Sequence, residues 1–139
     1  MRLDASTFAA NGPVVQALRT RFASTLAIYA FGSQVQGTAT ADSDLDLAIL
    51  VAGYANKLAL WNMATELAGL AGCPVDLLDL RAASTVMQYQ VITTGQRLWD
   101  CGLAADLFEC FVLSEKTDLD TVRAPLLADI AARGSIYGR

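Results

Sequence analysis

Two short motifs at a fixed spacing constrain this chain more than any other feature of its sequence. The pair Gly32-Ser33 ends one apolar run, and ten residues later Asp44 and Asp46 open the next run, Leu45–Val51. Short apolar runs bounded by turn residues are typical of buried strands. The spacing therefore predicts two strands whose connection joins an anion-binding turn to an acidic pair, and the chemistry of nucleotide phosphates needs both.

The acidic pair predicts a metal site. Asp44 and Asp46 are two residues apart on a predicted strand, so their side chains point the same way. Two carboxylates at that separation repel each other unless a cation lies between them. Mg²⁺ favours carboxylate and phosphate oxygens. For an isolated Asp-x-Asp pair, an acidic solvent-facing strand start is the alternative interpretation.

The Gly-Ser pair predicts a phosphate-binding turn. Gly32 has no side chain, so backbone N–H groups can approach a phosphate closely. Ser33 can donate its hydroxyl and begin a short helix that ends at Gly37, and the N-terminus of a helix favours an anion. Taken alone, such a pair after a strand is an ordinary turn, and Gly37 a simple helix terminator.

A third carboxylate is expected in the strand Val75–Leu80. Asp76 and Asp79 are three residues apart, so a regular strand places them on opposite faces and only one can join the acidic pair. We choose Asp76, which lies near the strand start between two apolar neighbours, where a buried charge needs a partner. Asp79 is then expected to be a surface or strand-end charge.

The order of apolar patterns predicts one mixed α/β (α+β) domain, with helices packed on a small mixed sheet. We expect a core over 1–100, C-terminal helices packed on it over 101–133, and a flexible tail over 134–139. Helices are predicted over Pro13–Phe22, Asn56–Ala71, Ala83–Thr93, Leu103–Lys116 and Val122–Ala132, and strands over Leu26–Phe31, Leu45–Val51, Val75–Leu80 and Arg97–Trp99.

Composition narrows the chemistry. The 139 residues include no histidine, which excludes Ser-His and Cys-His nucleophilic catalysis and every His-ligated metal site. The net charge of −4 argues against direct binding of nucleic acid. No apolar run approaches the roughly 18 residues of a membrane span. We expect a cytoplasmic protein in which Cys73, Cys101 and Cys110 are reduced.

These motifs resemble a known family. Gly32-Ser33, ten residues and Asp44-Leu45-Asp46 match the GSx10DxD pattern of the polymerase-β-like nucleotidyltransferase superfamily. The sequence of Ser43–Ala48 is similar to that of the minimal nucleotidyltransferase (MNT) branch of this superfamily. The MntA-like members of this branch are antitoxins, paired with HEPN-domain, HepT-like toxins in type VII-like toxin–antitoxin systems.

The resemblance implies an activity and a role for each site residue. Gly32 and Ser33 would hold the triphosphate of ATP, and Asp44 and Asp46 would ligate two Mg²⁺ ions. Asp76 would complete one of these sites and help to deprotonate the attacking hydroxyl. The protein would transfer AMP from ATP to a tyrosine of the HEPN toxin and so silence its RNase activity.

The chain also departs from the family pattern. Many relatives carry arginine in the Gly-Ser loop, where this chain has Gln34 and Gln36. This difference predicts less positive charge around the triphosphate. Arg81 or Arg97 could substitute, although a surface role is the simpler expectation for both. The alternative functions are a small-molecule (aminoglycoside-type) nucleotidyltransferase and an inert antitoxin that acts by binding alone.

The C-terminal helix carries an apolar stripe whose use the sequence leaves open. Packing on the core is the simpler expectation, and a surface for a partner is the alternative. The residues of the stripe are Leu103, Leu107, Phe108, Phe111 and Val112.

Overall fold

The computed structural model describes residues 12–32 and 44–117 and confirms the mixed α/β fold class. Each element predicted within these ranges is present, with ends that shift by two residues or fewer. The short helix expected from Ser33, the helix Val122–Ala132 and the tail 134–139 lie outside the described residues. The elements are α1 (Pro13–Arg21), β1 (Thr25–Phe31), β2 (Leu45–Val51), α3 (Lys57–Ala71), β3 (Val75–Asp79), α4 (Thr85–Thr94), β4 (Gln96–Asp100) and a helix over 103–117.

The four strands form one mixed sheet in the order β3-β2-β1-β4. β1 pairs antiparallel with both β2 and β4, whereas β2 and β3 are parallel. Parallel neighbours need a crossover connection, and α3 supplies it. β4 lies at the edge of the sheet, as its short sequence pattern predicts.

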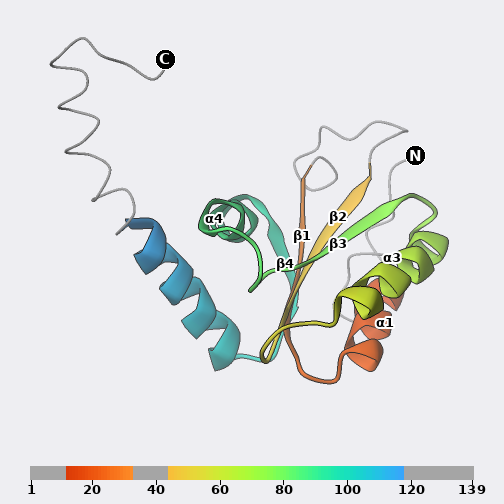
Figure 1. The fold of residues 1–139 in the computed structure, drawn as a ribbon, viewed down its shortest axis with the longest axis horizontal. Helices are drawn as coiled ribbons and strands as arrows, with labels where there is room; N and C mark the ends of the chain where they lie inside the picture. The colour runs from red at the N-terminus through yellow and green to blue at the C-terminus, as the bar shows by residue number, and fades with distance from the viewer. Residues whose placement is uncertain (1–11, 33–43, 118–139) are drawn as a thin grey trace, which may run out of the picture.

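Helices cover both faces of the sheet. Helices α1 and α3 lie against one face, and α4 and the helix 103–117 lie on the other (Figure 1). Strand β1 shows the consequence, because Ile28 and Ala30 belong to the first core and Ala27 and Tyr29 to the second. A strand buried on both faces has no polar alternation, which explains the continuous apolar runs in the sequence.

Side chains at the helix ends explain where α3 and α4 begin. Asn56 precedes α3, and its side-chain oxygen accepts a hydrogen bond from the backbone N–H of Ala59 at 3.0 Å. Ser84 caps α4 in the same way, accepting from the N–H of Met87 at 3.2 Å. Such caps satisfy N–H groups that have no partner within the helix.

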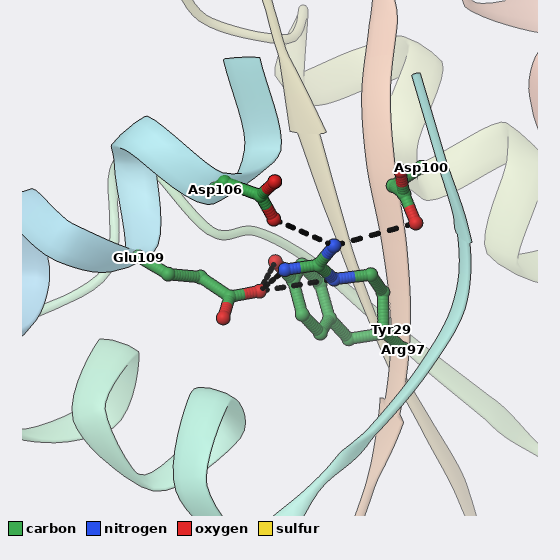
Figure 2. A network of polar contacts seen from close by, with 5 residues as sticks. All are labelled: Tyr29, Arg97, Asp100, Asp106 and Glu109. Carbon is green, nitrogen blue, oxygen red and sulfur yellow. Dashed lines mark hydrogen bonds and ion pairs between the residues drawn. The ribbon is translucent and has the colours of Figure 1, made fainter. Parts of the chain in front are cut away.

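A polar network fastens the helix 103–117 to the sheet (Figure 2). The buried Tyr29 donates its hydroxyl to Glu109 at 2.6 Å, and Arg97 of β4 donates to the same carboxylate through Nε at 3.0 Å and also through Nη2. Arg97 also pairs with Asp106 at 3.1 Å and Asp100 at 3.3 Å. Burial and then the bond to Glu109 raise the pKa of Tyr29, so its hydroxyl stays a donor. The network therefore holds this helix at a fixed place on β1 and β4.

Among the described residues, no helix combines the length and the apolar character needed to cross a membrane. Cys73, Cys101 and Cys110 are all free cysteines.

The network predicts a specific cost for losing the Tyr29 hydroxyl. Tyr29→Phe leaves part of the Glu109 carboxylate without its donor, and we expect the free energy of unfolding to fall by about 1–2 kcal/mol. The matched control is Tyr54→Phe, because Tyr54 is 72% exposed, and it should change stability by less than about 0.5 kcal/mol. Urea denaturation measures both; equal stabilities of the two variants would contradict the role of the network.

Candidate functional site

Strand pairing brings the predicted acids to one end of the sheet. The parallel register places Asp46 of β2 directly beside Asp76 of β3, and Asp44 immediately precedes β2. Residues directly paired in a sheet present their side chains on the same face. The antiparallel register places Asp46 opposite Phe31, the last residue of β1. The end of β1 and the starts of β2 and β3 thus meet at the acids.

Gly32 packs directly against Asp46. Its φ is +79°, a left-handed conformation that favours glycine, and a Cβ built on it would lie 2.2 Å from Oδ2 of Asp46. A side chain at residue 32 would therefore displace the Asp46 carboxylate. The first glycine of the Gly-Ser motif thus makes room for the aspartate that follows fourteen residues later.

The carboxylates of Asp76 and Asp44 act on the carboxylate of Asp46. Burial raises the pKa of Asp46, and the neighbouring carboxylates of Asp76 and then Asp44 raise it further. Ionising Asp46 beside another carboxylate costs electrostatic free energy, and a bound cation would remove that cost. Burial and like-charge repulsion together make Asp46 the centre of the arrangement.

The donor set fits Mg²⁺. Within residues 12–32 and 44–117, no three His, Cys, Asp or Glu side chains form a ready-made metal-binding group, so the acids do not yet converge on one point. Mutual repulsion opposes such convergence. Mg²⁺ is commonly held by one or two carboxylates with substrate phosphates and water completing its shell. Asp44, Asp46 and Asp76 provide hard oxygen ligands of that kind.

The structure separates Asp76 from Asp79 and corrects both expected environments. Asp76 is exposed at the start of an edge strand, and it is not buried between its apolar neighbours. Asp79 is buried and is not a surface charge, although it does end β3. Its carboxylate accepts backbone N–H bonds from Ala55 at 2.8 Å and Arg81 at 3.1 Å. Asp79 therefore organises the loops at the other end of the strand.

The two candidate substitutes for the missing loop arginines are engaged elsewhere. Arg97 belongs to the network with Glu109, and Arg81 lies over the Phe108 ring and donates to the carbonyl of Val51. Ser33, Gln34, Gln36 and Gly37 lie outside the described residues.

Sequence reasoning missed one neighbour of the site. Burial raises the pKa of the Cys73 thiol, the nearby backbone of Leu45 lowers it, and the Asp44 carboxylate raises it again. Cys73 comes two residues before β3, which lies parallel to β2. A predicted parallel register would have found it, because the residues before two parallel strands lie side by side.

Comparisons with known proteins match the chain to nucleotidyltransferases. Residues 15–101 match the family model described as polymerase beta nucleotidyltransferase. The chain is 37% identical over 119 residues to the protein adenylyltransferase MntA of Shewanella oneidensis strain MR-1, which covers 86% of each chain.

Solved structures extend the likeness to the C-terminal part. A toxin–antitoxin crystal structure with AMP-PNP contains a chain that is 34% identical with a TM-score of 0.77, covering 92% of this chain and 99% of that one. A second structure holds a tri-AMPylated Shewanella oneidensis HEPN toxin with its MNT antitoxin, at 32% identity and a TM-score of 0.72, covering 91% and 98%. Alignments that cover more than 90% of this chain must include residues that follow residue 101.

Two glycine substitutions distinguish the loss of stability caused by backbone strain from a loss of MgATP affinity caused by crowding of Asp46. Gly32 and Gly53 both have positive φ, so changing either to alanine should cost about 1–2 kcal/mol of stability. Only at Gly32 does the added methyl meet the Asp46 carboxylate, because nothing lies within 4 Å of a Cβ at Gly53.

We therefore expect Gly32→Ala to lose affinity for MgATP while Gly53→Ala keeps it. Isothermal titration calorimetry measures the affinity, and urea denaturation confirms that both variants are folded. Equal MgATP affinities in the two variants would refute the packing of Gly32 on Asp46 as a requirement of the site.

Proposed function

Since this chain belongs to the polymerase beta nucleotidyltransferase family, we propose that it is an antitoxin that transfers AMP from ATP to a tyrosine of a cognate HEPN-domain toxin. The observation that carries this proposal is the pairing of Asp46 with Asp76 beside the Gly32 turn. The 37% identity to a protein adenylyltransferase and the likeness to antitoxins solved with HEPN toxins support the choice of acceptor.

The three acids would hold Mg²⁺ and position the nucleotide. Asp44 immediately precedes β2 and Asp46 is its second residue, and the Asp46 carboxylate lies against the Gly32 turn. When two Mg²⁺ ions are bound, they neutralise charge on the attacking and leaving oxygens of an in-line displacement. Backbone groups at Gly32 and the hydroxyl of Ser33 would hold the triphosphate, since the positive φ of Gly32 turns the chain sharply there.

Asp76 would take the proton of the acceptor. It is exposed, unlike Asp46, so a hydroxyl from a partner can reach it. The tyrosine oxygen forms a new bond to the α-phosphorus, the bond to the pyrophosphate oxygen breaks, and pyrophosphate leaves. The hydroxyl proton passes to the Asp76 carboxylate. Holding nucleotide and tyrosine together removes much of the entropic part of the barrier.

Incubation with toxin and MgATP tests the proposal directly. We expect the mass of the cognate HEPN toxin to increase by one or more AMP units and its RNase activity to fall in parallel. EDTA should abolish the transfer and added Mg²⁺ should restore it, because the site offers carboxylates as its metal ligands. An unchanged toxin mass in the presence of MgATP would reject the proposed reaction.

The two aspartates of β3 provide a matched pair of variants. Asp76→Asn should keep its stability, because Asp76 is exposed, and should lower the rate of AMP transfer about 100-fold or more by removing the general base. Asp79→Asn should lose about 1–3 kcal/mol of stability, because an amide cannot accept both backbone N–H bonds, while the folded fraction still transfers AMP.

Mass spectrometry of the toxin gives the rate, and thermal or urea unfolding gives the stability. The assignment of roles fails if Asp79→Asn abolishes transfer in a fully folded protein while Asp76→Asn transfers AMP at the normal rate.

A further inference from the structure

The helix 103–117 has an apolar outer face as well as an apolar inner face. Ala105, Phe108 and Val112 are buried against the sheet. The outer stripe, which consists of Leu103, Leu107 and Phe111, is exposed to 71%, 59% and 56%. These three residues are spaced four apart, so they lie along one side of the helix. The expectation that they pack in the core is therefore wrong, and only Phe108 and Val112 of the predicted stripe do so.

The exposure of the outer stripe calls for a partner. A surface helix normally turns its apolar stripe toward the core and polar side chains toward water, so a second, outward-facing apolar stripe is unexpected. Three large apolar side chains in a row form a patch of the kind that marks protein–protein contact, whereas scattered exposed apolar residues need no explanation.

A groove beside the outer stripe indicates what the partner offers. Its volume is about 370 Å³, and apolar side chains form most of its wall. Among the described residues that line it, the charged one is Arg81, a half-buried side chain that donates from Nη2 to the Val51 carbonyl at 3.3 Å and whose Nε is buried. A guanidinium at the wall of an apolar groove suits a carboxylate. The residues that line the groove are Leu26, Arg81, Ala104, Leu107, Phe108 and Phe111.

The position of the helix along the chain connects it with the toxin-bound relatives. The family model ends at residue 101, two residues before the helix begins. The likeness to the toxin–antitoxin structure nevertheless covers 92% of the chain, so it extends into the segment beyond the shared catalytic core. A segment that follows the core and is shared with antitoxins solved beside a toxin is a natural place for partner recognition.

The helix also lies on the face of the sheet that carries the acids. Asp46 and Ala48 are two residues apart on β2 and share a face, and Ala48 belongs to the same core as Phe108. The network of Tyr29, Arg97 and Glu109 fixes the helix there before any partner arrives (Figure 2). A rigid docking surface loses little entropy on binding.

We propose that the outer stripe and the adjoining groove form the docking surface for the HEPN toxin, which inserts apolar side chains flanked by a carboxylate that meets Arg81. This inference rests on the proposed function, since it identifies where the toxin binds while its tyrosine is modified. The apolar contacts supply affinity, and the Arg81 pairing sets the register of the partner on the helix.

Charge substitutions on the outer stripe test the proposal. The double variant Leu107→Glu with Phe111→Glu alters only exposed side chains, so it should fold and bind MgATP normally. Its affinity for the cognate toxin should be about tenfold weaker or more, because two carboxylates would face an apolar contact. The matched control is Leu70→Glu on α3, which is 49% exposed and lies on the opposite side of the sheet. The control should bind the toxin as wild type does.

Steady-state kinetics provide a second readout. With the double variant, AMP transfer should fall at low toxin concentration and recover at saturating toxin, so that KM for the toxin rises and kcat stays constant. A single variant, Leu103→Glu, repeats the measurement at the most exposed residue of the stripe if the double variant loses its fold.

The possible outcomes are distinct from those of the proposed reaction. Wild-type AMP transfer with undiminished toxin affinity in the double and single variants would overturn the docking surface and leave the reaction intact. Toxin binding that weakens in the variants, without any AMP transfer by wild type, would support the surface and reject the reaction. Equal weakening by Leu70→Glu, or a wild-type dimer that the double variant dissociates without effect on toxin binding, would also overturn the proposal.

Discussion

The parallel pairing of β2 with β3 is the constraint on which the rest of this molecule depends. It sets Asp46 and Asp76 side by side, and the N-terminal end of β2 adds Asp44 to the same end of the sheet. Neighbouring like charges at one end of a sheet oppose folding unless a cation or a cationic group compensates them. The sheet can bear this cost because both of its faces are packed with apolar side chains elsewhere. The fold therefore places an unfavourable arrangement of charge where magnesium and phosphate chemistry would make it useful.

The two covered faces of the sheet have different roles. On one face, α1 and α3 build a core and α3 provides the crossover that makes β2 and β3 parallel (Figure 1). On the other face, α4 and the helix 103–117 pack beside the strands that end or begin at the acids. The network around Arg97 connects that helix to β1 and β4. A toxin bound to the helix would thus be held on the same sheet that carries the three acids.

Much of the fold and the outline of the site could be predicted from sequence, because both depend on local patterns. The apolar runs gave the limits of β2 directly, and the alternation of side chains along a strand correctly separated Asp76 from Asp79. The burial of Asp79 could not be predicted, because its partner Ala55 is 24 residues away and contributes only a backbone N–H.

The outer stripe shows a different limit of the sequence. Leu103, Leu107 and Phe111 have the composition of a core, and composition cannot tell which side of a helix meets the sheet when both sides are apolar. The contact of Gly32 with Asp46 was also beyond reach, because it depends on the tertiary register of β1 and β2. The motif indicated that both residues matter, but only the structure gives the reason that one must be glycine.

The most direct measurement is anomalous diffraction from crystals of this protein grown with Mn²⁺ and a non-hydrolysable ATP analogue. Mn²⁺ prefers the same oxygen ligands as Mg²⁺, and its anomalous signal marks its position independently of the protein atoms. We expect Mn²⁺ peaks in contact with the carboxylates of Asp44, Asp46 and Asp76 and with phosphate oxygens of the nucleotide. Bound nucleotide with no metal at these three carboxylates, or metal held elsewhere in the chain, would contradict the assignment of this end of the sheet as the catalytic site.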